Sequence, residues 1–227
     1  MLRHQGRPCR VGLAQIGEGR RLEFAVTQMA RLVDEGARDE GAWAAAVRDL
    51  DVTDFVLAAT ARSLVDLPDV NSRTDGVSVW RRRRIHLGLA VSLPGGLVVP
   101  VIRDADRLGI DELHDRAVAL ASAARDGTLS PDRMTGSTFT VSNLGMYGVD
   151  EFSAIINPGE AAILAVASAV PTPVVTIEGG IAVRSIMRLT LSADHRLVDG
   201  ELGARFLGAV RRRLEDPGSL SLELANV

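Results

Sequence analysis

The stretch RLTLSADHRLVDGELGARFLG, residues 188–208, changes structural type in its middle. Its first part alternates as a β-strand does, and its last part repeats apolar residues at helical spacing. His195 stands between them, in the triplet Asp-His-Arg at 194–196, and Asp199 follows before the helix. A side chain at a strand end is held by the scaffold yet reachable, which is typical of catalytic groups. Spacing alone leaves two interpretations open: His195 is a working base, or it is a surface residue beside a helix cap at Asp199.

Three other kinds of histidine site do not fit this stretch. A kinase catalytic loop needs an aspartate two residues after the histidine, but position 197 is leucine. A zinc site needs three or four ligands at recognisable spacing, and no histidine or cysteine lies near His195, so no metal is expected. A hydrolase with a nucleophile elbow needs the motif G-x-S-x-G, which the sequence lacks.

Outward from this stretch, the apolar spacing predicts the remaining elements. Helices are expected over 27–50, 51–68 (capped by Asp51 or Thr53), 110–127 (capped by Asp111) and 199–217. Strands are expected over 21–26, 85–91, 97–102, 137–142, 160–170, 179–185 and 186–194, although the Ala-rich segment 160–170 could be helical. We expect an irregular N-terminal segment over 1–20 and one domain over 21–227, with an α/β fold of the two-layer α+β kind. Its mixed sheet should carry helices mainly on one face.

The composition narrows the function classes. Net charge is −3 and aromatic residues make up 4% of the chain, which argues against a nucleic-acid partner. No run of residues reaches the ~20 apolar residues of a membrane span, and residues 1–20 do not resemble a signal peptide. The single cysteine, Cys9, cannot form an internal disulfide. We therefore expect a cytoplasmic protein with no membrane partner.

All 26 Lys and Arg residues are arginine. Without a side-chain amine the chain cannot form a lysine Schiff base, and it has no P-loop lysine. It also cannot carry lipoate or biotin on a lysine of its own.

Ser142 and the arginine run are further candidates. Ser142 ends the predicted strand STFTVS and opens the glycine-rich NLGMYG. Its hydroxyl could either bond its own turn or donate to a developing oxyanion. The run RRRR at 81–84 could be a solvated strand edge or a phosphate contact. Among the other histidines, His86 is expected to be a packed or merely polar strand residue, whereas His4 and His114 are expected on the surface.

Three long motifs together resemble one family. SADHRLVDG is similar to the D-H-R-x-x-D-G signature of the catalytic domain of dihydrolipoamide acyltransferases, the core enzymes of 2-oxoacid dehydrogenase complexes. GSTFTVSNLGMYGVDEFSAIINPGEAAILAV and HLGLAVSLPGGLVVPVIRDAD resemble two further blocks of that family, in the family's order. The resemblance covers about 50–220, with a fainter match from about 22. It implies a chloramphenicol acetyltransferase-like fold, trimers, and an active-site channel between subunits.

The resemblance also implies roles for single residues. His195 would be the general base on a thiol, Ser142 would stabilise the oxyanion, and Asp199 would hold the turn that carries His195. Arg84, Asn143 and Arg196 are predicted to bind coenzyme A, the second substrate. The reaction would transfer an acyl group, with acetyl favoured, between dihydrolipoamide and coenzyme A.

The sequence departs from the family pattern in two respects. It contains neither a lipoyl domain nor a peripheral-subunit-binding domain, so a lipoyl-bearing protein of a 2-oxoacid dehydrogenase complex would supply the lipoyl group in trans. The arginine-rich first helix of the family has no clear counterpart in 1–20. An alternative is therefore a structural remnant that packs with complete acyltransferase cores. A condensation-type acyltransferase would share the fold but carry a second histidine at position 194, where this chain has aspartate.

Overall fold

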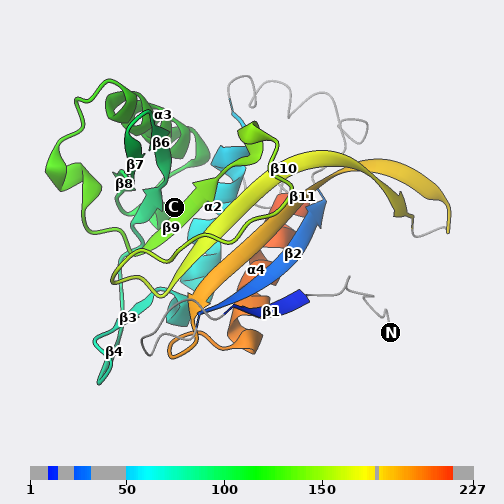
Figure 1. Cartoon of the computed structure of the whole chain (residues 1–227), viewed down its shortest axis with the longest axis horizontal. Helices are drawn as coiled ribbons and strands as arrows, with labels where there is room; N and C mark the ends of the chain where they lie inside the picture. Colours follow the sequence, from blue (N-terminus) through cyan, green and yellow to red (C-terminus); the bar gives the residue numbers. More distant parts are fainter. Residues whose placement is uncertain (1–9, 15–22, 32–49, 177–178, 217–227) are drawn as a thin grey trace.

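A seven-stranded mixed sheet organises the molecule (Figure 1). The computed structural model describes residues 10–14, 23–31, 50–176 and 179–216. The strands lie in the order β1 (Arg10–Ala14), β2 (Glu23–Arg31), β11 (Ile181–Asp194), β10 (Ala162–Val175), β9 (Phe139–Asn143), β5 (Leu87–Leu89) and β8 (Val101–Ile102). Strand β9 is parallel to both of its neighbours, and the other pairs are antiparallel. The mixed sheet predicted from the sequence is thus confirmed.

Two small hairpins stand apart from the sheet. One pairs β3 (Ser72–Thr74) with β4 (Val79–Arg81), and the other pairs β6 (Val91–Leu93) with β7 (Gly96–Val98). The predicted strand pair over 85–102 is therefore four short strands, in which β5 and β8 join the main sheet. Gly96 closes the tight turn with a φ of 155°, a backbone conformation that favours glycine.

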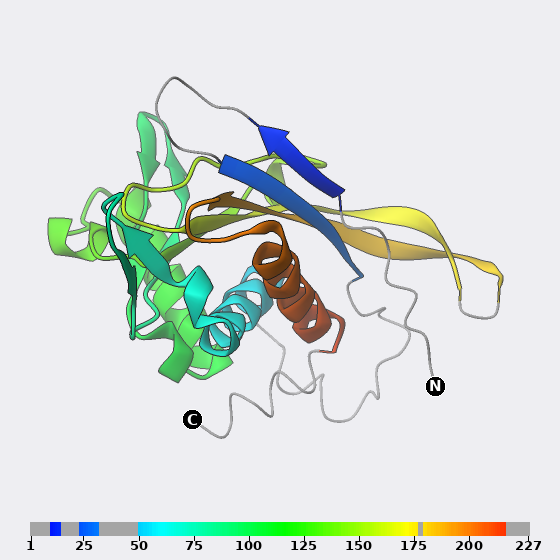
Figure 2. The same ribbon diagram turned by 90° about the horizontal axis from the view of Figure 1, so that it is seen from below.

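Three long helices in the described part of the chain accompany the sheet: α2 (Val52–Asp66), α3 (Ile110–Arg125) and α4 (Gly200–Glu215). Figure 2 shows α2 and α4 together on one face of the sheet, as predicted. Short 3₁₀ helices η2 (Pro68–Val70), η3 (Ala105–Arg107), η4 (Pro131–Met134) and η5 (Gly145–Tyr147) lie in the connections. Within the described ranges, no helix is long and apolar enough to cross a membrane.

The apolar core lies between these helices and the sheet. Helix α4 contributes a stripe that begins at the half-buried Leu202 and continues with buried Phe206, Ala209, Val210 and Leu214, as its spacing predicts. The ring of Phe206 meets that of Phe139 on β9, with centroids 5.4 Å apart and planes at 53°. Both rings are fully buried, so they attach the helix that follows His195 to the strand that carries Ser142.

Truncating Phe206 should lower the free energy of unfolding, because the ring contact with Phe139 is lost. The Phe206→Ala variant is expected to lose about 3–5 kcal/mol of unfolding free energy, because it removes a fully buried ring and leaves a cavity. Urea unfolding followed by circular dichroism measures the loss. The neighbouring side chain of Arg205 is 63% exposed, so Arg205→Ala should change stability by less than about 0.5 kcal/mol. Equal losses in the two variants would contradict this assignment of the core.

Several predictions of local structure were wrong. Residues 27–31, expected in a helix, belong to β2, because pairing with β1 and β11 overrides their helical spacing. The remainder of that expected helix, 32–49, lies outside the described residues. The segment 1–20, expected to be irregular, contains the strand β1. The segments 179–185 and 186–194 form one strand, β11, and 160–170 lies mostly in β10.

The helix starts were predicted with mixed success. Asp51 caps α2 as expected and forms a capping box, in which its carboxylate accepts from two helix amides and Asp54 bonds back to the cap. Asp111, in contrast, is not a cap. The cap of α3 is Gly109, two residues before Asp111, so the Asp111 charge lies inside the first turn, where the helix dipole favours it.

Candidate active site

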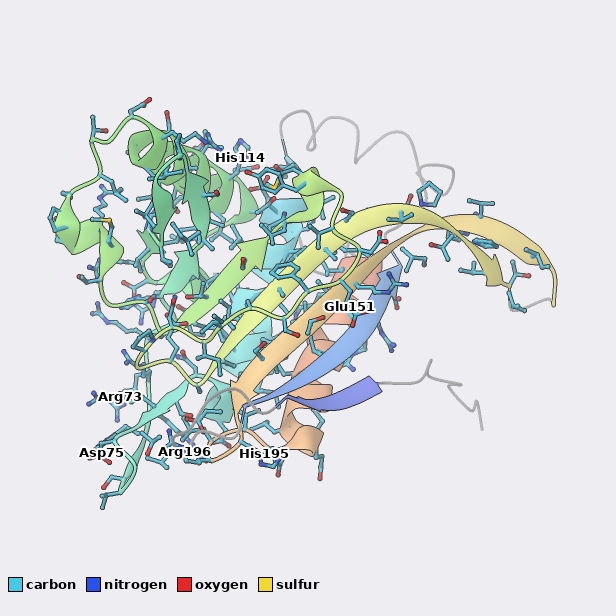
Figure 3. The ribbon with its side chains drawn as sticks, viewed as in Figure 1. Arg73, Asp75, His114, Glu151, His195 and Arg196 are labelled. Atoms are coloured by element: carbon cyan, nitrogen blue, oxygen red, sulfur yellow. The ribbon has the colours of Figure 1, made fainter. Side chains whose placement is uncertain are left out.

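His195 stands in a tight turn between the end of β11 and the start of α4. The amides of Leu197 and Val198 both donate to the carbonyl oxygen of Asp194, at 2.9 and 3.0 Å. The His195 side chain is exposed on this turn, next to Arg196 at the lower edge of the view in Figure 3. The prediction of a reachable histidine on a fixed backbone is confirmed.

The two residues that flank His195, Asp194 and Arg196, form an ion pair with each other. The Asp194 side chain is 1% exposed, and its two oxygens accept from Nε of Arg196 at 2.9 and 3.2 Å and from Nη2 at 2.5 Å. The same carboxylate accepts from the Arg196 amide at 3.1 Å, and its hydrogen bonds raise the pKa of the Arg196 guanidinium. Because Asp194 and Arg196 flank the histidine, their bidentate contact restrains the backbone at His195. We call this pair the Asp194–Arg196 clip.

Asp199 caps helix α4. Its carboxylate accepts from the amide of Leu202 at 2.8 Å, and its backbone is extended, as a cap requires. The cap fixes the point at which the turn becomes a helix, so Asp199 holds the segment that presents His195. No contact links Asp199 to a reacting group, and its place among the catalytic residues stays a prediction.

Ser142 lies near the end of β9, opposite Ala165 of β10, with a half-buried side chain. The loop after it folds onto an irregularity in β10, where the register with β11 shifts between Val166 and Ala169. The amide of Leu144 donates to Val166 O at 3.0 Å, and the Ser168 hydroxyl donates to Gly145 O at 2.8 Å. Bulges of this kind are enriched beside active sites, where they redirect side chains.

Asn143 attaches the end of β9 to two neighbours. Its Oδ1 accepts from the Gly145 amide at 2.8 Å, and its Nδ2 donates to Thr53 Oγ1 of α2 at 3.1 Å. A Cβ on Gly145 would lie 3.1 Å from both Asn143 Oδ1 and Ala167 O, so this close approach needs glycine. Each end of the Asn143 carboxamide therefore already has a partner within the protein. Its predicted role in binding coenzyme A stays a prediction.

Ser142 and His195 cannot meet within one chain. Ser142 pairs with Ala165, which pairs with Thr190 on the next strand, five residues before His195. Two strand spacings across the sheet and five residues along it place the two backbones roughly 19 Å apart. A serine and a histidine side chain together span far less than this distance. Bringing the two groups together requires a second copy of the chain.

The arginine run at 81–84 is mostly paired. Arg81 contacts the Asp69 carboxylate, Arg82 donates to Gly159 O at 3.0 Å, and Arg84 lies 3.6 Å from Asp104. The Arg84 side chain remains 69% exposed and could still reach an anion. Its role, like that of Arg196, in binding coenzyme A stays a prediction.

Two further histidines lie in defined environments. His86 is half buried and accepts from the Asp104 amide through Nδ1 at 2.9 Å, and burial lowers its pKa. The packing of His86 agrees with the expectation, but the residue lies one position before β5 rather than within a strand. His114 was expected on the surface, and its side chain is 23% exposed. The expectation missed its partner, because Nδ1 of His114 lies 2.9 Å from Oδ2 of Asp54, whose side chain is 4% exposed. His4 lies outside the described residues.

Glu160 is a buried carboxylate that the sequence analysis did not identify as a candidate. Glu160 is 2% exposed, and its Oε1 accepts from Ser137 at 2.5 Å and from Thr140 at 3.0 Å. Burial raises the pKa of this carboxyl group. Glu160, the glutamate of the motif INPGE, thus contacts Thr140, which lies on β9 two residues before Ser142. In the described part of the chain, no group of three or more His, Cys, Asp or Glu side chains could hold a metal ion.

The mixed sheet with its helices has a chloramphenicol acetyltransferase-like fold. A chloramphenicol acetyltransferase structure superposes with a TM-score of 0.52 at 16% identity, over 86% of this chain and 87% of that one, a likeness that shows the fold alone. The family model of the 2-oxoacid dehydrogenases acyltransferase (catalytic domain) matches residues 21–222. The chain belongs to this family.

Individual relatives agree with the family model. The chain is 43% identical over 175 residues to the dihydrolipoyllysine-residue acetyltransferase component of the pyruvate dehydrogenase complex of Schizosaccharomyces pombe. That match covers 76% of this chain but 36% of the relative. A dihydrolipoamide acetyltransferase from Azotobacter vinelandii, solved to examine a serine, a histidine and an asparagine in its mechanism, has a TM-score of 0.80 at 33% identity. The cubic core of a pyruvate dehydrogenase complex gives the same values, and both structures match over 88% of this chain and 84% of theirs.

Proposed function

We propose that the chain transfers an acyl group, with acetyl favoured, between dihydrolipoamide and coenzyme A. The observation that carries the proposal is His195, exposed on a turn that the Asp194–Arg196 clip and the Asp199 cap hold in place. The family and the relatives named above support this chemistry. The catalytic domain in this proposal comprises residues 21–227, and the cytoplasmic location stays a prediction.

The proposed reaction needs one base and one oxyanion donor. A free thiol has a pKa of about 8.5, so near neutral pH its proton must leave as the sulfur attacks. The His195 imidazole takes this proton, and the thiolate adds to the thioester carbonyl carbon. The tetrahedral intermediate carries a negative oxygen, to which the Ser142 hydroxyl donates. When the intermediate collapses, the C–S bond of the old thioester breaks, and the departing thiolate takes the proton from the imidazolium.

The active unit in this proposal is a trimer. The separation of Ser142 from His195 supports a site shared between two subunits, since neither residue has the other within its own chain. A cyclic trimer brings one face of each subunit to a different face of the next, which repeats the same mixed site three times. The three sites would give coenzyme A and the dihydrolipoyl group access to the same pair of residues.

The end of the β10–β11 hairpin supports this assembly. Beyond the main sheet, residues 170–176 and 179–185 form an arm that projects from the body (Figure 1). Here, within the described residues, β10 and β11 pair only with each other. Val175, Ile181 and Val183 on the arm are 71%, 80% and 63% exposed. Two isolated strands with exposed apolar side chains are marginally stable in water, so a neighbouring subunit is the proposed cover.

The substrate contacts in the proposal come from three residues. Arg84, Asn143 and Arg196 would contact coenzyme A, with the exposed Arg84 guanidinium suited to a phosphate. The chain has no lysine to carry lipoate. The proposed source of the dihydrolipoyl group is a lipoyl-bearing component of a 2-oxoacid dehydrogenase complex.

An acetyl-transfer assay tests the function directly. Purified protein incubated with acetyl-CoA and free dihydrolipoamide should form S-acetyldihydrolipoamide and release coenzyme A, which thiol titration and mass spectrometry both measure. Sedimentation of the same sample should give a trimer or a multiple of it. A stable monomer without transfer would favour the alternative, a structural remnant that packs with complete acyltransferase cores. Transfer by a monomer would contradict the shared site.

A further inference from the structure

The N-terminal end of α2 is tied to the strand that carries Ser142. Asn143, the residue after Ser142, donates to Thr53 Oγ1 at 3.1 Å. Thr53 lies in the first turn of α2, and its own amide donates to the Asp51 cap at 2.6 Å. A single hydrogen bond thus connects a capped helix end to the residue beside the proposed oxyanion donor.

The same helix end is fastened to α3. Asp54 closes the capping box by accepting from the Asp51 amide at 2.8 Å through Oδ2. That oxygen also lies 2.9 Å from Nδ1 of His114 on α3. The Asp54 side chain is 4% exposed and that of His114 is 23% exposed, so the contact is largely shielded from solvent. Residues from two helices and one strand therefore form one continuous chain of contacts.

This chain of contacts has no role in the proposed chemistry. Figure 3 shows His114 and His195 at opposite ends of the same chain. The proposed chemistry uses His195 and Ser142, and Nδ1 of His114 contacts Asp54. An oxyanion donor must nevertheless lie within about 2.7–3.1 Å of the developing charge. Small displacements of Ser142 would therefore weaken catalysis. The side-chain contacts of Asn143 restrain the strand end together with its pairing to β10.

We propose that Thr53 is a positioning residue, which holds Ser142 in place through Asn143 while the Asp54–His114 contact anchors the helix end. This inference rests on the proposed acyl transfer and deepens it. Thr53 touches no substrate in this arrangement. Its hydroxyl fixes the orientation of the Asn143 amide, and Asn143 Oδ1 in turn holds the Gly145 amide at 2.8 Å. The ends of this short path, Thr53 and Gly145, can be probed separately.

The strength of the Asp54–His114 contact, which we call the anchor, should depend on pH. The groups that face His114 are Asp54 on α2, Asp51 at its cap and Asp115 on its own helix, and the contact with Asp54 raises the His114 pKa. Burial raises the pKa of Asp54 as well. A raised folded-state pKa contributes stability that is complete below the unfolded value and is lost as pH rises through the folded value. The anchor should therefore weaken above about pH 6.5, the unperturbed value for histidine.

A matched pair of variants tests the role of Thr53. Thr53→Val removes the hydroxyl with little change of shape, whereas Thr53→Ser keeps it. In the trimer, Thr53→Val should lower kcat roughly ten- to hundredfold and leave the KM for dihydrolipoamide unchanged. Hydrogen exchange at the Gly145 amide should accelerate in the same variant. Thr53→Ser should restore both readouts. Thr135→Val, a change at the exposed threonine that follows η4, should alter neither.

Each outcome decides the proposal. Slower turnover together with faster Gly145 exchange supports it. Unchanged Gly145 exchange overturns it, as does unchanged kcat in an active enzyme whose Gly145 exchange has accelerated. If the wild-type chain transfers no acetyl group, the proposed function fails. Hydrogen exchange at the Gly145 amide then decides alone whether Thr53 restrains the Asn143 carboxamide. For the anchor, the stability difference between wild type and His114→Gln should shrink between about pH 6 and about pH 9; a constant difference overturns the role of His114.

Discussion

Replacing His195 with alanine should lower the rate of acetyl transfer from acetyl-CoA to dihydrolipoamide by roughly a hundred- to ten-thousandfold. The alanine methyl group cannot accept the thiol proton, and at neutral pH the fraction of free thiolate is small. The loss should appear in kcat more than in KM, because the base acts in the transition state. Raising the pH should recover part of the rate in the variant, since the solution then supplies the thiolate directly. Stopped assays from neutral to alkaline pH measure both effects.

The fold should survive this substitution. His195 is exposed on its turn, and the clip and the cap that hold the turn use Asp194, Arg196 and Asp199. The unfolding free energy of His195→Ala is therefore expected to lie within about 0.5 kcal/mol of wild type. Arg205→Gln, an exposed change one turn into α4, serves as the matched control and should keep full activity. Wild-type turnover in His195→Ala would refute the proposed base.

The turn around His195 could be predicted from sequence because its signals are local. The alternating strand before it, the cap at Asp199 and the helical stripe ending at Leu214 all lie within one short segment. Each of them is independent of residues far along the chain. The long motifs then supported the family and the fold, which the comparisons confirm.

What could not be predicted depends on contacts between distant segments. Residues 27–31 have helical spacing, and only their pairing with β11, more than 150 residues later, makes them a strand. His114 meets Asp54 across 60 positions of sequence, so nothing near His114 indicates a partner. Glu160 becomes a buried acid because Ser137 and Thr140 surround it in the fold. In each case packing between elements decides the outcome.

Mixing two inactive variants should restore activity if the site is shared between subunits. Ser142→Ala alone should lose roughly a hundred- to a thousandfold in kcat, as removal of an oxyanion donor does. His195→Ala is inactive for the separate reason given above. When the two are unfolded, mixed and reassembled together, a site is intact where a subunit with a native His195 meets one with a native Ser142. Random mixing in equal amounts makes about a quarter of the sites intact.

The mixed sample should therefore recover about a quarter of the wild-type rate, far above either variant alone. Unmixed variants taken through the same reassembly provide the baseline, and wild type treated identically provides the reference. A site built within one chain would give no recovery, because every chain in the mixture lacks either Ser142 or His195. The strand register argues against that result. It holds the two backbones roughly 19 Å apart in each chain, which leaves the neighbouring subunit as the source of the missing group.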